Sequence, residues 1–212
     1  MGKYLTALGR SEAEYTEKRS KFIATLCHCE NEEQAMAFID EMRSKYWDAR
    51  HNVFAYSVNK GVSARFSDDG EPHGTAGKPI LDVINGSGVT DIVIVVTRYF
   101  GGILLGTGGL VRAYSKSAKD SISNAKLAEM IPCTVFETDC EYTDHQRLAS
   151  LIESCGGVTE NSDYTDKVKL TYYFKDTDIG GFLPKLSETF SARITAIEVE
   201  KRISPIEIEN IL

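Results

Sequence analysis

The chain has 212 residues, of which 42% are apolar and 26% are charged, and its formal net charge is −7. This composition is typical of a globular protein with a packed core, and the longest aliphatic run, Ile92–Val96, is far too short to span a bilayer. Because the first residues also lack the apolar stretch of a signal peptide, we expect a cytoplasmic protein with no membrane partner.

The charge is distributed unevenly along the chain. Residues 1–130 contain as many basic as acidic residues, so the whole net charge comes from residues 131–212. This difference predicts two domains with different surfaces. The five cysteines form no CxxC pair, which indicates reduced thiols rather than a metal site.

The first half is predicted to alternate strands and helices. In chain order we expect strands at Tyr4–Leu8, Glu12–Thr16 and Phe22–Cys29, a helix over 31–46, a strand at Asn52–Asn59, a loop at Ser67–Pro79, a short helix at Ile80–Ile84, a strand at Asp91–Arg98 and a helix at Thr107–Leu127. Asn31 and Gln34 form a capping box that begins the first helix. We expect Asn85–Ser87 to be a turn.

A domain boundary is predicted at residue 130, because Pro132 cannot continue the preceding helix. The second half is then expected to contain a strand at Cys133–Tyr142, a helix at Thr143–Cys155, strands at Val158–Tyr164 and Lys167–Lys175, a helix at Gly181–Phe190 and a strand at Arg193–Arg202. Thr143 and Gln146 suggest a second capping box. The order βαββαβ is that of a ferredoxin-like domain, so we predict an α+β protein with domains 1–130 and 131–212.

Four side chains of the predicted 67–79 loop are candidates for a site: Asp68, Asp69, Glu71 and His73. They are suitable for binding a divalent metal or for proton transfer. However, the alternating ligands of a calcium loop are absent, and no metal or cofactor is predicted. In the alternative interpretation the aspartates only cap turns of this acidic loop.

The segment after the Asp91–Arg98 strand is dense in glycine, and we refer to residues 100–109 as the glycine loop. A helix that begins after such a loop presents unpaired N–H groups, which can hold a phosphate. The candidate residues of the loop are Gly101, Gly102, Gly106, Thr107, Gly108 and Gly109. A tight turn without a ligand is the other interpretation.

Arg98, Tyr99 and Phe100 end the buried strand where the glycine loop begins. Ligands often bind at such strand ends, and aromatic rings beside an arginine suit base stacking. Alternatively, Arg98 pairs with an aspartate of the acidic loop, and the two rings only cover the edge of the core.

Two basic residues of the following helix, Arg112 and Lys116, are candidates for phosphate contacts. A solvated helix face, on which Lys116 pairs with Asp120, is the simpler alternative. His51 could act as a base, but no nucleophile is evident beside it, and a structural histidine is the simpler interpretation.

Taken together, Asp68–Pro79 and Val96–Leu110 resemble the signature of the IMPACT/YigZ family, and the resemblance extends over the whole chain. It implies a ribosomal protein S5 domain 2-like fold for the N-terminal domain, followed by a ferredoxin-like domain, as in bacterial members. Eukaryotic members restrain a starvation-responsive kinase that acts on a translation initiation factor, which implies a link to translation and stress. The extra N-terminal domain of those longer proteins is absent from this sequence, so their partner is not carried over.

Two functions are consistent with these features. The leading hypothesis is a non-enzymatic regulator of translation that contacts RNA or a ribosome-associated protein, with Arg98, Arg112, Lys116 and the glycine loop holding phosphates. The alternative is an enzyme for a small phosphorylated ligand, in which the glycine loop binds phosphate and the acidic loop supplies the chemistry.

Overall fold

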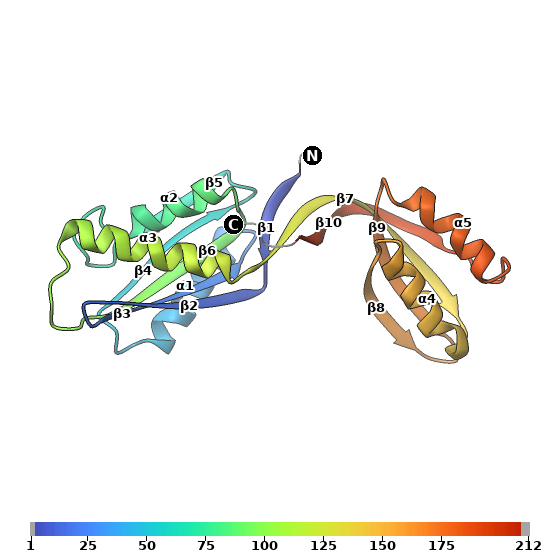
Figure 1. Cartoon of the computed structure of the whole chain (residues 1–212), viewed down its shortest axis with the longest axis horizontal. Helices are drawn as coiled ribbons and strands as arrows, with labels where there is room; N and C mark the ends of the chain where they lie inside the picture. Colours follow the sequence, from blue (N-terminus) through green and yellow to red (C-terminus); the bar gives the residue numbers. More distant parts are fainter. Residues whose placement is uncertain (1–2, 209–212) are drawn as a thin grey trace. The chain divides into compact units, whose positions relative to one another are not determined.

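The computed structural model describes residues 3–208, and the chain forms two compact α+β units. The first is built on Tyr4–Glu129 together with Glu207 and Ile208, and the second on Met130–Ile206. Each unit has its own sheet, shown with its helices in Figure 1. No helix among the described residues is long and apolar enough to cross a membrane.

The sheet of the first unit has the strand order β2-β3-β6-β4-β5. Its strands are β2 (Arg10–Glu17), β3 (Ser20–His28), β6 (Ile92–Tyr99), β4 (His51–Val58) and β5 (Ser63–Ser67), and all neighbours are antiparallel. The central strand β6 is apolar on both faces because helices cover both sides of the sheet. Figure 1 shows α2 (Gly77–Ser87) and α3 (Thr107–Ser123) on one face and α1 (Glu32–Lys45) on the other.

Alternation along β6 divides the core into two clusters. Ile94 and Val96 pack with residues of α2 and α3, whereas Val93 and Val95 pack with residues of α1. The register of the strands places Arg98 of β6 opposite both Phe22 of β3 and His51 of β4. The end of the central strand is therefore held from both sides at the point where the glycine loop begins.

The second unit has the predicted element order βαββαβ. It consists of β7 (Lys126–Cys140), α4 (Tyr142–Ser154), β8 (Val158–Tyr164), β9 (Val168–Lys175), α5 (Ile179–Thr189) and β10 (Ile197–Ile208). Strand β9 lies between β7 and β8, and β10 pairs with β7. Strand β1 (Tyr4–Leu8) belongs to the first unit. Side chains of α4 and α5 pack in one cluster against β7 and β9.

The predicted boundaries differ from the structure around Pro132. Helix α3 ends at Ser123 rather than Leu127, and β7 already begins at Lys126, so Pro132 lies inside a strand and does not end a helix. The fixed φ of proline is compatible with an extended strand, and Pro132 is exposed. The buried Leu127 and Ala128 fit an apolar helix face and a strand equally well, so the residue pattern alone does not show where the helix ends and the strand begins.

Several shorter predictions also need correction. Strand β5 was missed because it is a short edge strand with little apolar character. Helix α2 begins at Gly77, inside the predicted loop, and includes Asn85–Ser87, which was predicted to be a turn. The capping box at Thr143 does not form, since α4 begins one residue earlier after Glu141. The box at Asn31 is confirmed, because its side chain accepts a hydrogen bond from the Gln34 N–H.

Candidate functional site

The acidic loop and the glycine loop of the first unit line one cavity of about 380 Å³. The acidic loop contributes Glu71 and Pro72, and β6 contributes Arg98. The remaining lining residues are Arg50, Phe100, Leu104, Leu105, Gly106, Thr107 and Leu110. The two sequence segments that were singled out as candidates therefore meet, with a cleft between them.

A buried ion pair forms part of the wall of this cavity. Arg98 Nη1 donates to Glu71 Oε1 at 2.6 Å, and the two side chains are only 7% and 3% exposed. The Tyr114 hydroxyl of α3 donates to the same oxygen at 2.8 Å. Burial raises the pKa of Tyr114, and the neighbouring Glu71 carboxylate raises it further. The pair thus connects the acidic loop, the central strand and α3.

Two aromatic rings fix the Arg98 guanidinium. Its central carbon lies 5.5 Å from the centre of the Phe22 ring and 5.6 Å from that of Phe100. Despite this enclosure, Arg98 Nε has no hydrogen-bond partner, the one such buried side-chain nitrogen or oxygen within residues 3–208. An unsatisfied buried donor costs about 1–3 kcal/mol, and Arg98 is one of the residues that line the cavity.

The N-terminus of α3 is also without a cap. Gly106 precedes the helix with φ +72°, a conformation that favours glycine, and no side chain caps the first turn. The N–H groups of Thr107, Gly108 and Gly109 have no hydrogen-bond partner within the described part of the chain. Gly106 and Thr107 line the cavity, so the positive end of the helix is at its wall.

Other glycines of the loop have structural roles. A Cβ at Gly101 would lie 2.0 Å from the Arg19 carbonyl carbon, so the loop packs directly on the β2–β3 hairpin. Gly109 is buried against Leu105, whereas Gly102 is exposed. Gly101 and Gly109 therefore allow the glycine loop to pack closely on its neighbours.

Most of the acidic loop has a structural role as well. Asp68 Oδ1 accepts hydrogen bonds from the N–H groups of Ala76 and Gly77 at the start of α2, and its Oδ2 accepts one from Gly74. Asp69 Oδ2 accepts a hydrogen bond from the Asn52 N–H at 2.7 Å. Of the four acidic-loop candidates, only Glu71 lines the cavity.

The two histidines of this region lie outside the cavity lining. His73 is almost fully exposed, with its Nδ1 3.7 Å from Asp68 Oδ2. His51 Nδ1 donates to the Asp69 carbonyl oxygen at 2.7 Å and so anchors the acidic loop to β4. No group of three or more His, Cys, Asp or Glu side chains within residues 3–208 is arranged to hold a metal ion.

Tyr99 is not among the residues that line the cavity. Its hydroxyl donates to Asp48 at 2.8 Å, and burial together with this hydrogen bond raises the pKa of Tyr99 to about 12. Phe100 lines the cavity instead and is 46% exposed. Of the two rings, Phe100 is therefore the one placed to stack on a ligand.

Arg112 and Lys116 lie on an exposed face of α3 beside the β2–β3 hairpin. The hydrogen bond to Glu17 raises the pKa of Tyr15 in β2, and the nearby charges of Lys116 and Arg112 act in the opposite direction. Lys116 pairs with Asp120 at 2.6 Å, as the simpler interpretation expected. The hairpin tip adds Lys18 and Arg19, which the sequence patterns did not indicate. Together Lys18, Arg19, Arg112 and Lys116 form what we term the basic edge.

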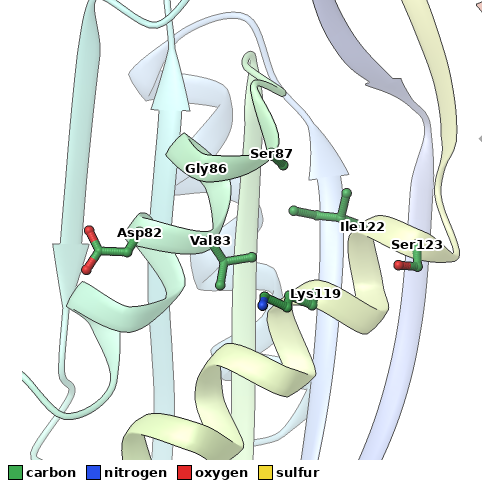
Figure 2. A pocket seen from close by; sticks show the side chains of 7 residues that line it. All are labelled: Asp82, Val83, Gly86, Ser87, Lys119, Ile122 and Ser123. Carbon is green, nitrogen blue, oxygen red and sulfur yellow. The ribbon is translucent and has the colours of Figure 1, made fainter. Parts of the chain in front are cut away.

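A second cavity, of about 410 Å³, lies between α2 and α3. Figure 2 shows Val83 of α2 and Ile122 of α3 projecting toward the gap between the helices, with Lys119 beside them. It contains none of the predicted site residues, and no unpaired buried polar side-chain atom within residues 3–208 faces it. The cleft between the two loops is therefore the stronger candidate site.

Comparisons with known proteins agree across both units. Residues 18–122 match the Impact N-terminal domain, and residues 138–193 match a domain of unknown function, DUF1949. The chain is 37% identical over 187 residues to "IMPACT family member YigZ" of Escherichia coli, covering 87% of this chain and 92% of the relative. It is 32% identical over 186 residues to "IMPACT family member YvyE" of Bacillus subtilis, covering 87% and 86%.

A eukaryotic relative and a solved structure extend this picture. The "Protein IMPACT homolog" of Saccharomyces cerevisiae is 34% identical over 95 residues, which cover 43% of this chain and 37% of the relative. A structure described as "Crystal structure of an hypothetical protein" superposes with a TM-score of 0.60 at 35% identity, covering 94% of this chain and 98% of that chain.

Proposed function

The chain belongs to the IMPACT family, and from this premise we propose that it is a non-enzymatic binding protein of translation that contacts RNA through the basic edge. The observation that carries the proposal is the cluster of exposed cations at the glycine loop. Lys18, Arg19 and Arg112 are exposed and have no ion-pair partner among the described residues.

The hairpin that presents two of these cations is conformationally costly. Lys18 and Arg19 form the two-residue turn between β2 and β3 with φ of 44° and 67°. Such turns favour Asn-Gly, because side chains other than Gly, Asn and Asp lose about 1–2 kcal/mol per residue in left-handed backbone. A turn that keeps Lys and Arg there despite this cost supports a binding role for the two side chains.

The glycine loop joins the hairpin to α3 in one surface. Gly101 packs on the Arg19 backbone, and Arg112 Nη1 lies beside Gly108 in the first turn of α3. The basic edge thus flanks the uncapped helix N-terminus, which adds partial positive charge. Phosphates of an RNA strand fit such a surface, and the exposed Phe100 offers a ring on which a base can stack.

The charge of the second unit limits this proposal to one part of the chain. All of the net negative charge comes from residues 131–212, which argues against RNA coating the whole protein. A protein partner at the ribosome is the role we propose for that half. The link to translation and stress rests on the family resemblance.

We also propose that the two domains have the folds that the family resemblance implies, and that the protein is cytoplasmic. The antiparallel sheet with α2 and α3 on one face supports an S5 domain 2-like fold for domain 1–130, and the βαββαβ order supports a ferredoxin-like fold for domain 131–212. The matched family regions end at residue 122 and resume at residue 138, which supports a boundary at 130.

The enzyme alternative has one observation in its favour, the cleft itself. Its proposed chemical groups, however, are committed elsewhere. Asp68 caps α2, Asp69 holds β4, and Glu71 is paired with Arg98 and Tyr114. Glu71 is the one acidic-loop carboxylate in the cleft lining, and its pairing with two buried partners supports binding better than catalysis.

The test is a titration of a labelled single-stranded RNA with the wild-type chain and the R19A/R112A variant at two salt concentrations. We expect tight binding at low salt, and the slope of log K against log salt should become shallower by about 0.7 for each phosphate that the variant no longer neutralises. Lys119→Ala is the matched control, since it removes an exposed cation of α3 two turns further along the helix. Unchanged binding by R19A/R112A would refute the basic edge as the RNA surface.

A further inference from the structure

We infer that the cavity between the acidic loop and the glycine loop is a separate binding site for a phosphomonoester carried on a nucleoside-sized body. The site shares Phe100 and the N-terminus of α3 with the proposed RNA surface, but none of the four cations of the basic edge lines it.

The first observation is the orphaned donor of Arg98. This side chain is 93% buried, since only 7% of it is exposed, yet its Nε has no partner while Nη1 is held by Glu71. Phe22 and Phe100 cover the guanidinium, so it cannot turn toward another acceptor in the protein. A buried polar side-chain atom without a partner is unusual in a folded protein, and Arg98 is one of the residues that line the cavity.

The second observation is the uncapped start of α3 at the same cavity. Gly106 and Thr107 are in the lining, and the free N–H groups of the first turn point out of the N-terminus of a 17-residue helix. Three such donors match a tetrahedral oxyanion such as phosphate. One cavity is therefore lined both by a residue with an unpaired donor and by an uncapped helix N-terminus.

The charges that face the cavity favour an anion. Glu71 is negative, but its charge is offset by the paired Arg98, and Arg50 adds an exposed cation at the lining. The helix N-terminus adds further positive potential. The formal charges of Arg50, Arg98 and Glu71 sum to +1.

The rest of the lining is suited to an organic body rather than a bare ion. Pro72, Leu104, Leu105 and Leu110 are apolar, and the Phe100 ring is available for stacking. A volume of about 380 Å³ falls at the lower end of small-molecule sites. A nucleoside monophosphate, with one phosphomonoester and a flat base, matches this combination.

Thermal stability and calorimetric titration test the site with the full chain. The probes are the four ribonucleoside 5′-monophosphates, the four unphosphorylated nucleosides and inorganic phosphate. A second arm compares one RNA oligonucleotide with a 5′-phosphate or a 5′-hydroxyl end, because a free nucleotide and an RNA end share the same chemistry. The key variant is Thr107→Glu, which places a carboxylate at the exposed first position of α3, where it stabilises the helix but repels an anion.

The expected result is that at least one monophosphate, or the 5′-phosphorylated RNA, binds and raises the melting temperature while its unphosphorylated counterpart does not. Thr107→Glu should weaken this binding about tenfold or more. Lys119→Gln, which removes one positive charge elsewhere on α3, should leave it unchanged. The inference is overturned if no phosphomonoester binds at millimolar concentration, if the nucleosides bind equally well, or if Thr107→Glu retains wild-type affinity. The RNA proposal fails separately, on R19A/R112A with 5′-hydroxyl RNA.

Discussion

Replacing Glu71 with glutamine should destabilise the first unit strongly. The variant keeps the size of the side chain and an oxygen for the Tyr114 hydroxyl, but it leaves the Arg98 charge buried without its counterion. Both partners are almost completely buried, at 7% and 3% exposure, so water cannot replace the missing carboxylate. Breaking a buried ion pair by removing one partner costs about 3–5 kcal/mol. In urea this corresponds to a fall in the midpoint of about 1 M or more.

The Arg10–Glu41 pair, which makes two N–O contacts where Arg98–Glu71 makes one, offers a control on the surface. Its N–O distance is also 2.6 Å, but its side chains are 55% and 47% exposed. The Arg10 hydrogen bond holds the pKa of Glu41 below its usual range, yet an exposed pair of this kind is worth only about 0–1 kcal/mol. Glu41→Gln should therefore leave the urea midpoint nearly unchanged.

Urea unfolding followed by circular dichroism, with hydrogen exchange of the β6 amides, measures both variants. The double variant E71Q/R98M removes both buried charges and should regain most of the stability, because an apolar replacement of a buried pair is often neutral. A destabilisation below about 1 kcal/mol for Glu71→Gln, equal to that of Glu41→Gln, would refute the reasoning that burial makes this pair important.

Three further predictions concern the loops and the strand end. Gly101→Ala should destabilise the first unit by about 1–3 kcal/mol because its Cβ would lie 2.0 Å from a backbone carbon, whereas Gly108→Ala, which meets only a side-chain tip, should be tolerated in urea unfolding. Asp68→Ala should cost about 1–2 kcal/mol through loss of the α2 cap, and the exposed His73→Ala should have no effect on the midpoint. The pKa of Tyr99 is raised from 10.0 to about 12 in the folded chain, so its protonated hydroxyl stabilises the fold fully below pH 10 and progressively less as the pH approaches 12. Tyr99→Phe should therefore lose less stability than the wild type between pH 10 and 12, as measured by melting curves at a series of pH values.

Local patterns predicted most elements of the fold. Tyr4–Leu8 and Val158–Tyr164 begin and end as strands where their residue patterns indicate. The end of α3 was not predictable, because Leu127 and Ala128 are buried in the strand that follows and their pattern suits a helix as well. The family identification from the two signature segments is confirmed by the matched domains.

The candidate site was predictable in its location but not in its hydrogen-bond partners. One of the two interpretations of Arg98 paired it with an aspartate of the acidic loop, but its partner is Glu71, while Asp68 caps a helix. That choice depends on how the loop returns from β5 to α2, a tertiary feature that spacing does not encode. Lys18 and Arg19 were missed because their two-residue turn lacks the Asn-Gly signal of a hairpin.

The most direct test of the central claim is to locate RNA on the chain by nuclear magnetic resonance. With ¹⁵N-labelled protein and a single-stranded RNA oligonucleotide, we expect the amide signals of Gly101, Gly106 and Gly108 to shift, since Gly101 packs on the Arg19 backbone and the other two lie at the N-terminus of α3. The signals of Gly156 and Gly180 in the second unit should remain in place. Shifts confined to the second unit, with the glycine loop unaffected, would contradict the account.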